Sequence, residues 1–337
     1  MKQPKYLFNA GRMSRRDNTL KYTPVDEAGV EGQPRYLPIE QVGDLYIFGS
    51  LDANSALYNF LGQEGIAVHF FNYYEHYTGS FMPREYLLAG KMQVDQTRHY
   101  MAAKKRIEIA RRFVEGAANN ILRVLKYYDN RDKAKELSEA ITTIDRLLAN
   151  VPTATDVPML MGIEGNIRQT YYGAFDSIVG QTFCMDGRSK RPPQNELNAL
   201  ISFGNMLCYT ACLSTIYHTQ LNPTISFLHE PGARRYSLAL DLAEVFKPIL
   251  VDRLIFRMIN KRQIQPSDFR SEVGGCVLKD AARKRFVQGF DEQLKETIKH
   301  RVLGRNVSYR HLVKLECYKL QKHLLGIEEY RPFKAWW

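Results

Sequence analysis

The sequence is poor in the features that mark secreted, disulfide-linked and membrane-spanning proteins. It has five cysteines and no CxxC pair, which argues against a disulfide framework and a structural zinc site. Cys208 and Cys212 share one face of a predicted helix and are expected to be core thiols. The start of the chain lacks the long apolar core of a signal peptide, and the most apolar stretch, Ala199–Tyr217, is interrupted by Gly204 and Asn205. We therefore expect a cytoplasmic protein without a membrane partner.

Acidic residues are also in deficit. The chain of 337 residues has 36 Asp and Glu against 47 Lys and Arg, a net charge of +11. A surplus of this size favours a polyanionic partner, with nucleic acid ahead of a membrane surface. Hydrophobic residues make up 45% of the chain, enough at this length to bury a large core. The composition is therefore that of a basic, globular protein with one large domain or two ordinary ones.

Up to about Pro83 the apolar pattern is that of short strands. These runs are rich in aromatic or β-branched residues and are separated by turn formers. One helix interrupts them, because Ser50 or Asn54 can cap a run that stops at Gly65. We expect a small sheet domain with an inserted helix and with strands at Tyr6–Phe8, Leu20–Thr23, Tyr36–Ile39, Leu45–Phe48 and Val68–Phe71.

After Pro83 the apolar period becomes helical and stays so. Ser308 is a good N-cap for the last helix, and Gly326 can end it. The expected fold class is α+β: a small N-terminal β-rich domain over residues 1–85, followed by a larger all-α domain over residues 86–337. The expected helices cover Leu87–Asp129, Asp132–Leu148, Met159–Ile178, Asn195–Tyr217, Ser237–Ile259, Asp280–Leu303 and Ser308–Leu325.

Three side chains in the helical part, Glu164, His229 and Glu244, offer one nitrogen and two hard oxygen donors. This set suits a divalent metal such as Mg²⁺ or Mn²⁺ that keeps open positions for water and a phosphate. Asp241 and Glu244 are three residues apart, so both point to one side of a helix. A short loop can bring His229 back beside the first turns of that helix. Arg168, one turn after Glu164, is free to pair with a carboxylate or a phosphate oxygen.

Each of these residues also has a structural interpretation. Glu164 followed by an arginine four residues later is the pattern of an exposed salt bridge. A lone histidine such as His229 is not by itself a ligand. Asp241 and Glu244, near the start of their helix, can merely complement the helix dipole. Spacing alone leaves the choice between a metal site and structural roles open.

Three segments resemble signature motifs of the CRISPR-associated protein 1 family, the metal-dependent integrase of CRISPR adaptation. The first is Met161–Asn166 with the arginine and two tyrosines that follow it, the second is Arg191–Gly204, and the third is Phe227–Pro248. The motifs occur in the order of the family. The family also has an N-terminal β-rich domain followed by a larger helical catalytic domain, so the resemblance spans the whole chain.

The resemblance implies that Glu164, His229 and Glu244 are the catalytic residues and ligands of Mg²⁺ or Mn²⁺. It leaves Asp241 open between assisting the metal, binding a second ion and holding the site together. Arg168 is a supporting candidate. Two further residues, which either line the site or only cap and pack within their helix, are Asn198 and Ser202.

A metal held in this way would stabilise the charge that builds on a phosphodiester and help to activate the attacking hydroxyl. Water as the nucleophile gives hydrolysis, and a DNA 3′-hydroxyl gives strand transfer. The resemblance implies strand transfer: the 3′ ends of captured DNA are joined to a CRISPR repeat in antiviral defence, with endonuclease activity as a side reaction. Two alternatives stay open, a metal-dependent nuclease or resolvase of branched DNA in repair, and a non-catalytic DNA-binding scaffold.

The partners that the resemblance implies are double-stranded and branched DNA and a second copy of the chain, through a homodimer formed by the N-terminal domains. CRISPR-associated protein 2 would bridge two such dimers, and CRISPR-associated protein 4 is an optional further partner. Cations that flank the motifs are candidates for DNA binding. Arg234 and Arg235 are the better ones, followed by Lys190 and Arg191, and a further basic cluster runs from Lys299 to Arg310.

The C-terminal tail, residues 330–337, carries the two tryptophans of the chain after a turn-forming proline. Tryptophans at such a position would be exposed unless they dock on a surface. The sequence leaves open whether the tail docks on its own helical domain or on a partner.

Overall fold

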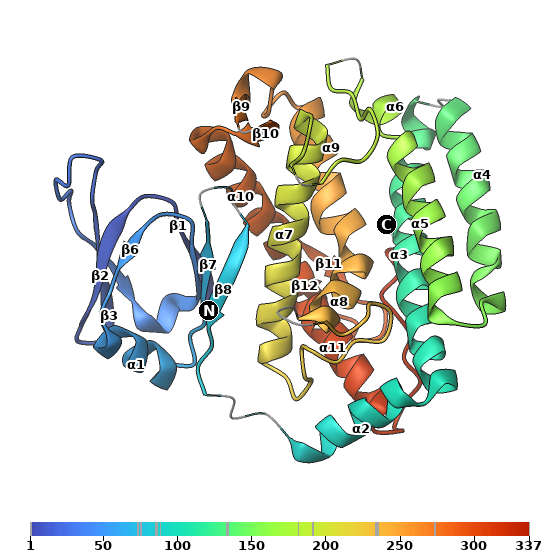
Figure 1. Ribbon diagram of the computed structural model, residues 1–337, viewed down its shortest axis with the longest axis horizontal. Coiled ribbons are helices and arrows are strands. Elements are labelled where there is room, and N and C mark those ends of the chain that lie inside the picture. The colour runs from blue at the N-terminus through green and yellow to red at the C-terminus, as the bar shows by residue number, and fades with distance from the viewer. Residues whose placement is uncertain are drawn as a thin grey trace. The chain divides into compact units, whose positions relative to one another are not determined.

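In the computed structural model the chain divides into two compact units, Met1–Tyr86 and Leu87–Trp337 (Figure 1). The first unit is rich in strands and the second in helices, so the expected α+β fold class is confirmed. The division falls next to the boundary at residue 85 that the change of apolar period predicts. The structure describes residues 2–72, 74, 76–84, 87, 89–132, 135–180, 182–190, 192–232, 236–272 and 274–336.

Two four-stranded sheets form the N-terminal unit. In the first, ordered β1-β5-β7-β8, three strands run parallel and β8 pairs antiparallel with β7. The second, ordered β4-β3-β2-β6, is antiparallel except where β6 pairs with β2. The strands are β1 Gln3–Leu7, β2 Gly11–Arg16, β3 Thr19–Pro24, β4 Arg35–Pro38, β5 Val42–Ile47, β6 Leu51–Asp52, β7 Val68–Phe71 and β8 Tyr77–Phe81.

Three of these strands, β2, β6 and β8, were not predicted. Only Met13 in β2 is a large apolar residue, because the other face of this strand is exposed and carries serine and arginine. Strand β6 has two residues, too few for any alternation. Strand β8 contains Gly79 and Ser80 between its aromatic ends, so it lacks the apolar alternation that marks a strand.

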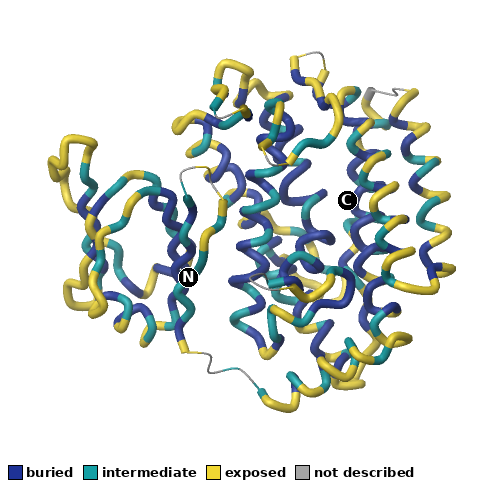
Figure 2. The backbone as a smooth tube through the Cα atoms, viewed as in Figure 1, coloured by how far each residue is buried: buried dark blue, intermediate teal, exposed yellow. Residues whose placement is uncertain are grey.

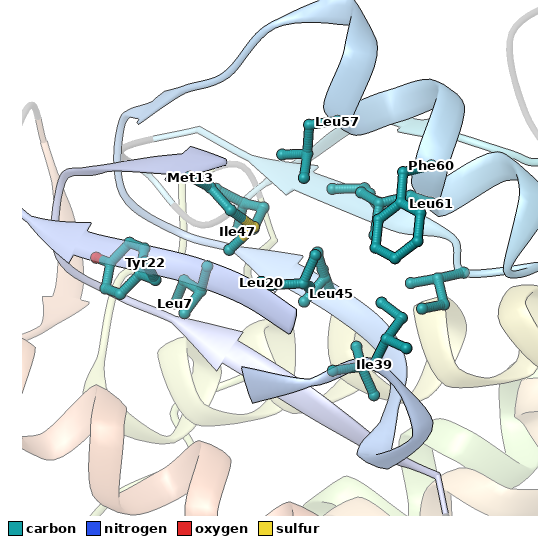
Figure 3. Packing of buried hydrophobic residues seen from close by; sticks show 13 residues of the cluster. Leu7, Met13, Leu20, Tyr22, Ile39, Leu45, Ile47, Leu57, Phe60 and Leu61 are labelled. Atoms are coloured by element: carbon teal, nitrogen blue, oxygen red, sulfur yellow. The ribbon is translucent and has the colours of Figure 1, made fainter. Parts of the chain in front are cut away.

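The core of this unit is a cluster of buried apolar side chains from both sheets and from helix α1, Ser55–Gln63 (Figure 3). Leu20 of β3 and Leu45 of β5 are completely buried in it, and Leu57 contributes from the helix. Of the two caps expected for this helix, Asn54 is the one used, since its Oδ1 accepts a hydrogen bond of 3.0 Å from the Leu57 amide.

The second unit is built mainly of helices. Helices α3, α4 and α5 contact one another, and α8 packs between α3 and α7 (Figure 1). Helix α7 is long and apolar enough to cross a membrane by length and composition, but most of it is buried inside this unit, as in the core helix of a globular domain (Figure 2). The helices are α2 Gly90–Met101, α3 Ala103–Asp132, α4 Lys135–Ala149, α5 Val157–Gly173, α6 Asp176–Val179, α7 Glu196–Tyr217, α8 Ser237–Lys247, α9 Arg253–Asn260, α10 Asp280–Lys295 and α11 Tyr309–Leu324.

Three of the expected helices are interrupted. The run Leu87–Asp129 is divided into α2 and α3 at Ala102, whose backbone is extended. The run Met159–Ile178 is divided into α5 and α6. The run Ser237–Ile259 passes through a π-helical turn at Pro248–Asp252, where the proline cannot donate the amide hydrogen bond that would continue the α-helix.

The expectation of an all-α second domain is wrong in two places. Strands β9 Phe269–Glu272 and β10 Gly275–Leu278 form one antiparallel ribbon, and β11 Thr297–Lys299 and β12 Asn306–Ser308 form another. Each turn contains a glycine with positive φ, +77° at Gly274 and +65° at Gly304, a conformation that glycine adopts without steric cost. The helix expected to reach Leu303 therefore stops at Lys295.

The described part of the C-terminal tail docks on its own unit. Tyr330 and Phe333 are buried, and both bond to Glu316 of α11, through the tyrosine hydroxyl at 2.7 Å and the phenylalanine amide at 2.9 Å. The Phe333 ring stacks on Phe246 of α8, with ring centroids 5.6 Å apart. The Asn120 Nδ2 of α3 donates hydrogen bonds to the Val245 carbonyl of α8 and to the Phe333 carbonyl of the tail. Asn120 thus fixes the tail against α8.

Candidate active site

The side chain of Arg168 on α5 forms an ion pair with a glutamate of α8. Glu164 and Arg168 lie one turn apart on α5, and the Arg168 Nε donates to Glu164 Oε1 at 3.1 Å. The Arg168 Nη2 donates to Oε2 of Glu244 on α8 and lies 3.4 Å from the Glu244 carbonyl oxygen. Two carboxylates from separate helices are therefore held by one guanidinium.

Glu244 is also paired with Lys247, one turn later on α8, whose Nζ donates to Oε1. All three side chains of this group are largely buried, with 9% of Glu244, 11% of Arg168 and 14% of Lys247 exposed. Burial alone would raise the pKa of Glu244, but the charges of Lys247, Arg168 and His229 outweigh it and hold that pKa well below its usual range. Glu244 is therefore a carboxylate throughout the physiological range.

Asp241 organises the loop before α8. Its Oδ2 accepts hydrogen bonds from the amides of Phe227 at 2.7 Å and Leu228 at 3.0 Å. Its Oδ1 accepts from the His229 amide at 2.9 Å and lies 2.8 Å from the His229 Nδ1. Because both oxygens of this fully buried carboxylate are used by the loop, Asp241 fixes the position of His229.

His229 is held with one ring nitrogen facing Asp241. A carboxylate can only accept, so Nδ1 carries the proton and Nε2 of the neutral ring has a free lone pair. Burial lowers the pKa of His229, but the hydrogen bond and charge of Asp241, together with the charge of Glu244, raise it above its ordinary value. The charge of Glu244 is thus among those that act on this imidazole.

Asp252, in the π-helical turn that follows α8, adds a buried acid that the sequence interpretation missed. Its side chain is 1% exposed. Burial raises the pKa of Asp252 to about 6, although the charges of Arg168 and Lys247 act to lower it. Lys247 was missed as well. The spacing could have indicated both residues, because Lys247 follows Glu244 by three positions and Asp252 by eight, which places them near one face of a continuous helix. Pro248, which lies between them, favoured an interrupted helix instead.

The two polar candidates on α7 lie in an adjoining network. Arg188 donates from Nη1 to Asn198 Oδ1 at 2.7 Å and from Nη2 to Ser202 Oγ at 3.1 Å. Asn198 also donates from Nδ2 to the Gly187 carbonyl at 2.8 Å, so it is an anchor for the loop before α7. The charge of Asp252 is among those that act on Arg188. The network around Arg188 is therefore coupled electrostatically to the acid that follows α8.

The structure thus brings some of the site residues expected from the sequence into contact. Arg168 contacts both Glu164 and Glu244, and Asp241 fixes the position of His229. Of the cations proposed to bind DNA, Lys190 is exposed on the loop before α7. The other three, Arg191, Arg234 and Arg235, lie outside the described residues.

The donor types fit a hard divalent ion, since Arg168 holds two carboxylates and the loop before α8 offers an imidazole with a free Nε2. No three His, Cys, Asp or Glu side chains within the described ranges are arranged as a ready metal site. Arg168 and Lys247 serve as counter-ions of Glu244. A divalent ion would compete with these two cations for the carboxylate oxygens of Glu244.

Comparison with known proteins identifies the family. The family model described as CRISPR associated protein Cas1 matches residues 5–292. A CRISPR-associated endonuclease Cas1 of Thermodesulfovibrio yellowstonii is 47% identical over 332 residues, which are 98% of this chain and 99% of that protein. A solved structure of a Cas1 protein from Thermotoga maritima has 40% identity and a TM-score of 0.86, covering 97% of this chain and 99% of that one.

Two structures of lower identity share the fold. A casposase bound to integration product has a TM-score of 0.86 at 18% identity, over 100% of this chain and 95% of that one. A Cas6-RT-Cas1–Cas2 complex has a TM-score of 0.84 at 19% identity, over 100% of this chain and 36% of that one. Since both the family match and the relative of 47% identity extend over most of its length, the chain belongs to the CRISPR-associated Cas1 family.

Proposed function

We propose that this chain is a metal-dependent DNA endonuclease and integrase of CRISPR adaptation, which joins the 3′-hydroxyl ends of captured DNA to a CRISPR repeat. The observation that carries the proposal is the meeting of Glu164 and Glu244 on one arginine, beside a histidine whose Nδ1 is fixed by Asp241. The net charge of +11 suits a DNA substrate. Similarity to endonucleases of the family and to a casposase bound to integration product supports the same chemistry.

In this proposal Glu164, Glu244 and the Nε2 of His229 hold Mg²⁺ or Mn²⁺. The metal would supply Lewis-acid polarisation of the phosphodiester and help to activate the attacking hydroxyl. Asp241 is a positioning residue, because it selects the His229 tautomer that leaves Nε2 free to bind.

The two cations of the site have a second role in the same proposal. Arg168 and Lys247 neutralise Glu244 while no divalent ion competes for it. Once that carboxylate is a metal ligand, the guanidinium and the ammonium are available to the phosphate oxygens of the substrate. Charge-assisted hydrogen bonds of this kind stabilise the charge that develops during phosphoryl transfer.

The decisive experiment measures metal binding and DNA joining on the same variants. Wild-type protein with Mn²⁺ or Mg²⁺ should join a 3′-hydroxyl DNA to a supercoiled target that contains a repeat. Glu164→Gln and His229→Ala should each reduce joining by at least about a hundredfold, since removal of a group that stabilises transition-state charge typically costs this much. Saturable Mn²⁺ binding, followed by calorimetry, should weaken in both variants.

A matched control is Glu139→Gln, which removes the same carboxylate from the exposed face of α4 and should leave both joining and Mn²⁺ binding unchanged. Undiminished joining by Glu164→Gln or His229→Ala would refute the assigned site. Cleavage of branched DNA without joining would favour a repair nuclease or resolvase instead. Absence of Mn²⁺ binding that depends on His229 would favour a non-catalytic scaffold.

The partners follow from the same proposal. Duplex and branched DNA are the substrates, two copies associate through the N-terminal unit, and a Cas2 protein joins two such dimers. The likeness to a chain of a Cas6-RT-Cas1–Cas2 complex supports the Cas2 partner. The homodimer, the Cas4 partner and the cytoplasmic location stay predictions from the sequence.

A further inference from the structure

The ribbon of β11 and β12 and the turn between them, residues 297–308, form a basic hairpin that the proposed chemistry does not use. The two strands pair in register from Thr297 with Ser308 to Lys299 with Asn306. The turn is held by its own hydrogen bonds, including one of 2.9 Å from the His300 amide to the Arg305 carbonyl. The hairpin is therefore a defined structural element that projects its turn residues.

Three cations of this hairpin, Lys299, Arg301 and Arg305, are exposed. No carboxylate in the part of the chain that the structure describes forms an ion pair with any of them. The acidic residues nearby are already neutralised: Glu296 pairs with Arg257 at 2.8 Å and Asp291 with Arg310 at 3.0 Å. Among the described residues, the hairpin therefore carries positive charge without a paired carboxylate.

Two histidines, His300 in the turn of the hairpin and His311 in α11, lie in the field of nearby cations. Burial lowers the pKa of His300, and the charges of Lys319 and His311 lower it further. Burial likewise lowers the pKa of His311, with the charges of Arg305 and Lys314 acting in the same direction. Cationic groups therefore act on both histidines, in agreement with the exposed cations of the hairpin.

The tip of the hairpin is apolar. Val302 is 88% exposed and Leu303 43% exposed, between the exposed cations on either side. The major groove of DNA admits a two-stranded ribbon, and a ribbon with an apolar tip and flanking cations has the charge to meet one. Duplex DNA offers phosphates that the cations can bind and a groove that the apolar tip can enter.

The C-terminal tail links this hairpin to the helix of the proposed metal site. Trp336 lies edge-on to His300, with ring centroids 5.9 Å apart, and the Arg301 guanidinium lies 5.4 Å from its ring. Trp336 also packs edge-on against Phe333, which stacks on Phe246 of α8, two residues after Glu244. The hairpin is thus connected through packed rings to the helix that carries Glu244.

We infer that the basic hairpin is a contact for duplex DNA, in which Lys299, Arg301 and Arg305 bind backbone phosphates and Val302 and Leu303 meet the groove. The inference rests on the proposed function only in taking duplex DNA as the substrate. Phosphate contacts of this kind position the duplex and do not read its sequence. The hairpin therefore orients DNA relative to α8 whatever the sequence bound.

The test is binding of a fluorescent duplex in EDTA, measured by anisotropy at several salt concentrations. The triple variant Lys299→Gln/Arg301→Gln/Arg305→Gln should bind at least about tenfold more weakly. The slope of log affinity against log salt should fall by about 2.7, because each lost phosphate contact contributes about 0.9 to it. The control Arg35→Gln/Lys91→Gln/Lys261→Gln removes three exposed cations from separate elements and should change the slope by less than about 1.

Equal loss in both triple variants would overturn the inference, because it would assign the effect to net charge. Unchanged affinity and slope in the hairpin variant would also overturn it, and would leave a protein partner as the ligand of this surface. The duplex titration contains EDTA, so it does not depend on a bound metal ion. Failure of the hairpin can therefore be told apart from failure of the proposed metal site, which the joining assay tests.

Tryptophan emission gives a second, local readout. Both tryptophans of the chain lie in the tail, so Trp337→Phe leaves Trp336, beside Arg301, as the sole probe. Duplex DNA should change its emission with the same midpoint as the anisotropy titration. Emission that does not respond while anisotropy saturates would place the bound duplex elsewhere and overturn the inference.

Discussion

Both units of this protein have a buried apolar core, and the helical unit also buries a group of paired charges. The cluster at the centre of the N-terminal unit is apolar, with Leu20 and Leu45 completely buried. The helical unit also has a large apolar core, but it buries Arg168, Glu244 and Lys247 together, with Asp252 close by. Buried apolar side chains stabilise the fold of each unit, whereas the buried charges of the helical unit maintain a charged site.

The difference is one of free energy. Removing an apolar side chain from water is favourable by about 25 cal/mol per Å² of buried area. Burying an ion pair costs desolvation of both partners, and their attraction in a medium of low dielectric constant only compensates for it. A cluster such as Arg168–Glu244–Lys247 adds little net stability, so its presence in the helical unit points to function.

The largest expected effect comes from uncoupling this charge cluster. Glu244→Gln leaves the Lys247 ammonium buried without the carboxylate that it bonds to, and should cost about 3–5 kcal/mol of unfolding free energy in the helical unit. Hydrogen exchange measures this loss because it resolves the two units. The double variant Glu244→Gln/Lys247→Met should recover part of it, since the unpaired charge is gone.

Leu45→Ala is the matching substitution in the N-terminal unit. It should cost about 2–5 kcal/mol there through lost burial and a residual cavity, and should leave exchange in the helical unit unchanged. A cost below about 1 kcal/mol for Glu244→Gln, or no recovery in the double variant, would show that the charges of the helical unit are less tightly coupled than their contacts indicate.

A smaller effect is expected from Asp252, and it depends on pH. The pKa of Asp252 is raised from 3.8 to about 6, so the folded protein binds this proton more tightly than the unfolded chain. The stabilisation is fully present below pH 3.8 and is lost as the pH rises through 6. Relative to wild type, Asp252→Asn should therefore gain about 3 kcal/mol of stability over this interval.

Urea unfolding of both proteins across that interval measures the gain as the difference between their free energies of unfolding. The difference between Leu45→Ala and wild type should stay constant over the same range, since that substitution changes no titratable group. A constant difference for Asp252→Asn as well would mean that this carboxyl titrates alike in the folded and unfolded states.

The sequence could predict the features of the fold that depend on neighbouring residues. Aromatic and β-branched content marked Val68–Phe71 with the bounds that the structure has, and local capping chemistry marked Asn54 and Ser308. These features depend on neighbouring residues. Ribbon β11–β12 was missed because its three-residue strands follow a helix without a change of apolar period, and only Gly304 marked the turn.

The site was predictable in residue type and less so in arrangement. Glu164, His229 and Glu244 were recognisable from motifs, and Asp241 was left open until its hydrogen bonds to the loop were seen. The pairing of Arg168 with Glu244, 76 residues apart, depends on how α5 packs near α8. Local spacing pairs Arg168 with Glu164 alone, so the link between the helices could not be predicted from it.

The smallest expected effect is one that both units should share. Asn54 caps α1 and Asp156 caps α5, each through a side-chain oxygen that accepts an amide hydrogen bond, at 3.0 Å and 2.8 Å. Both caps are exposed, so their contribution depends on the local backbone and not on either core. Asn54→Ala and Asp156→Ala should each cost about 1 kcal/mol, read from hydrogen exchange of the first helical turn. Similar costs would show that the units differ in their cores and not in these caps. A cost at Asp156 well above about 2 kcal/mol would mean that the start of α5 is coupled to Glu164 and Arg168 further along the same helix.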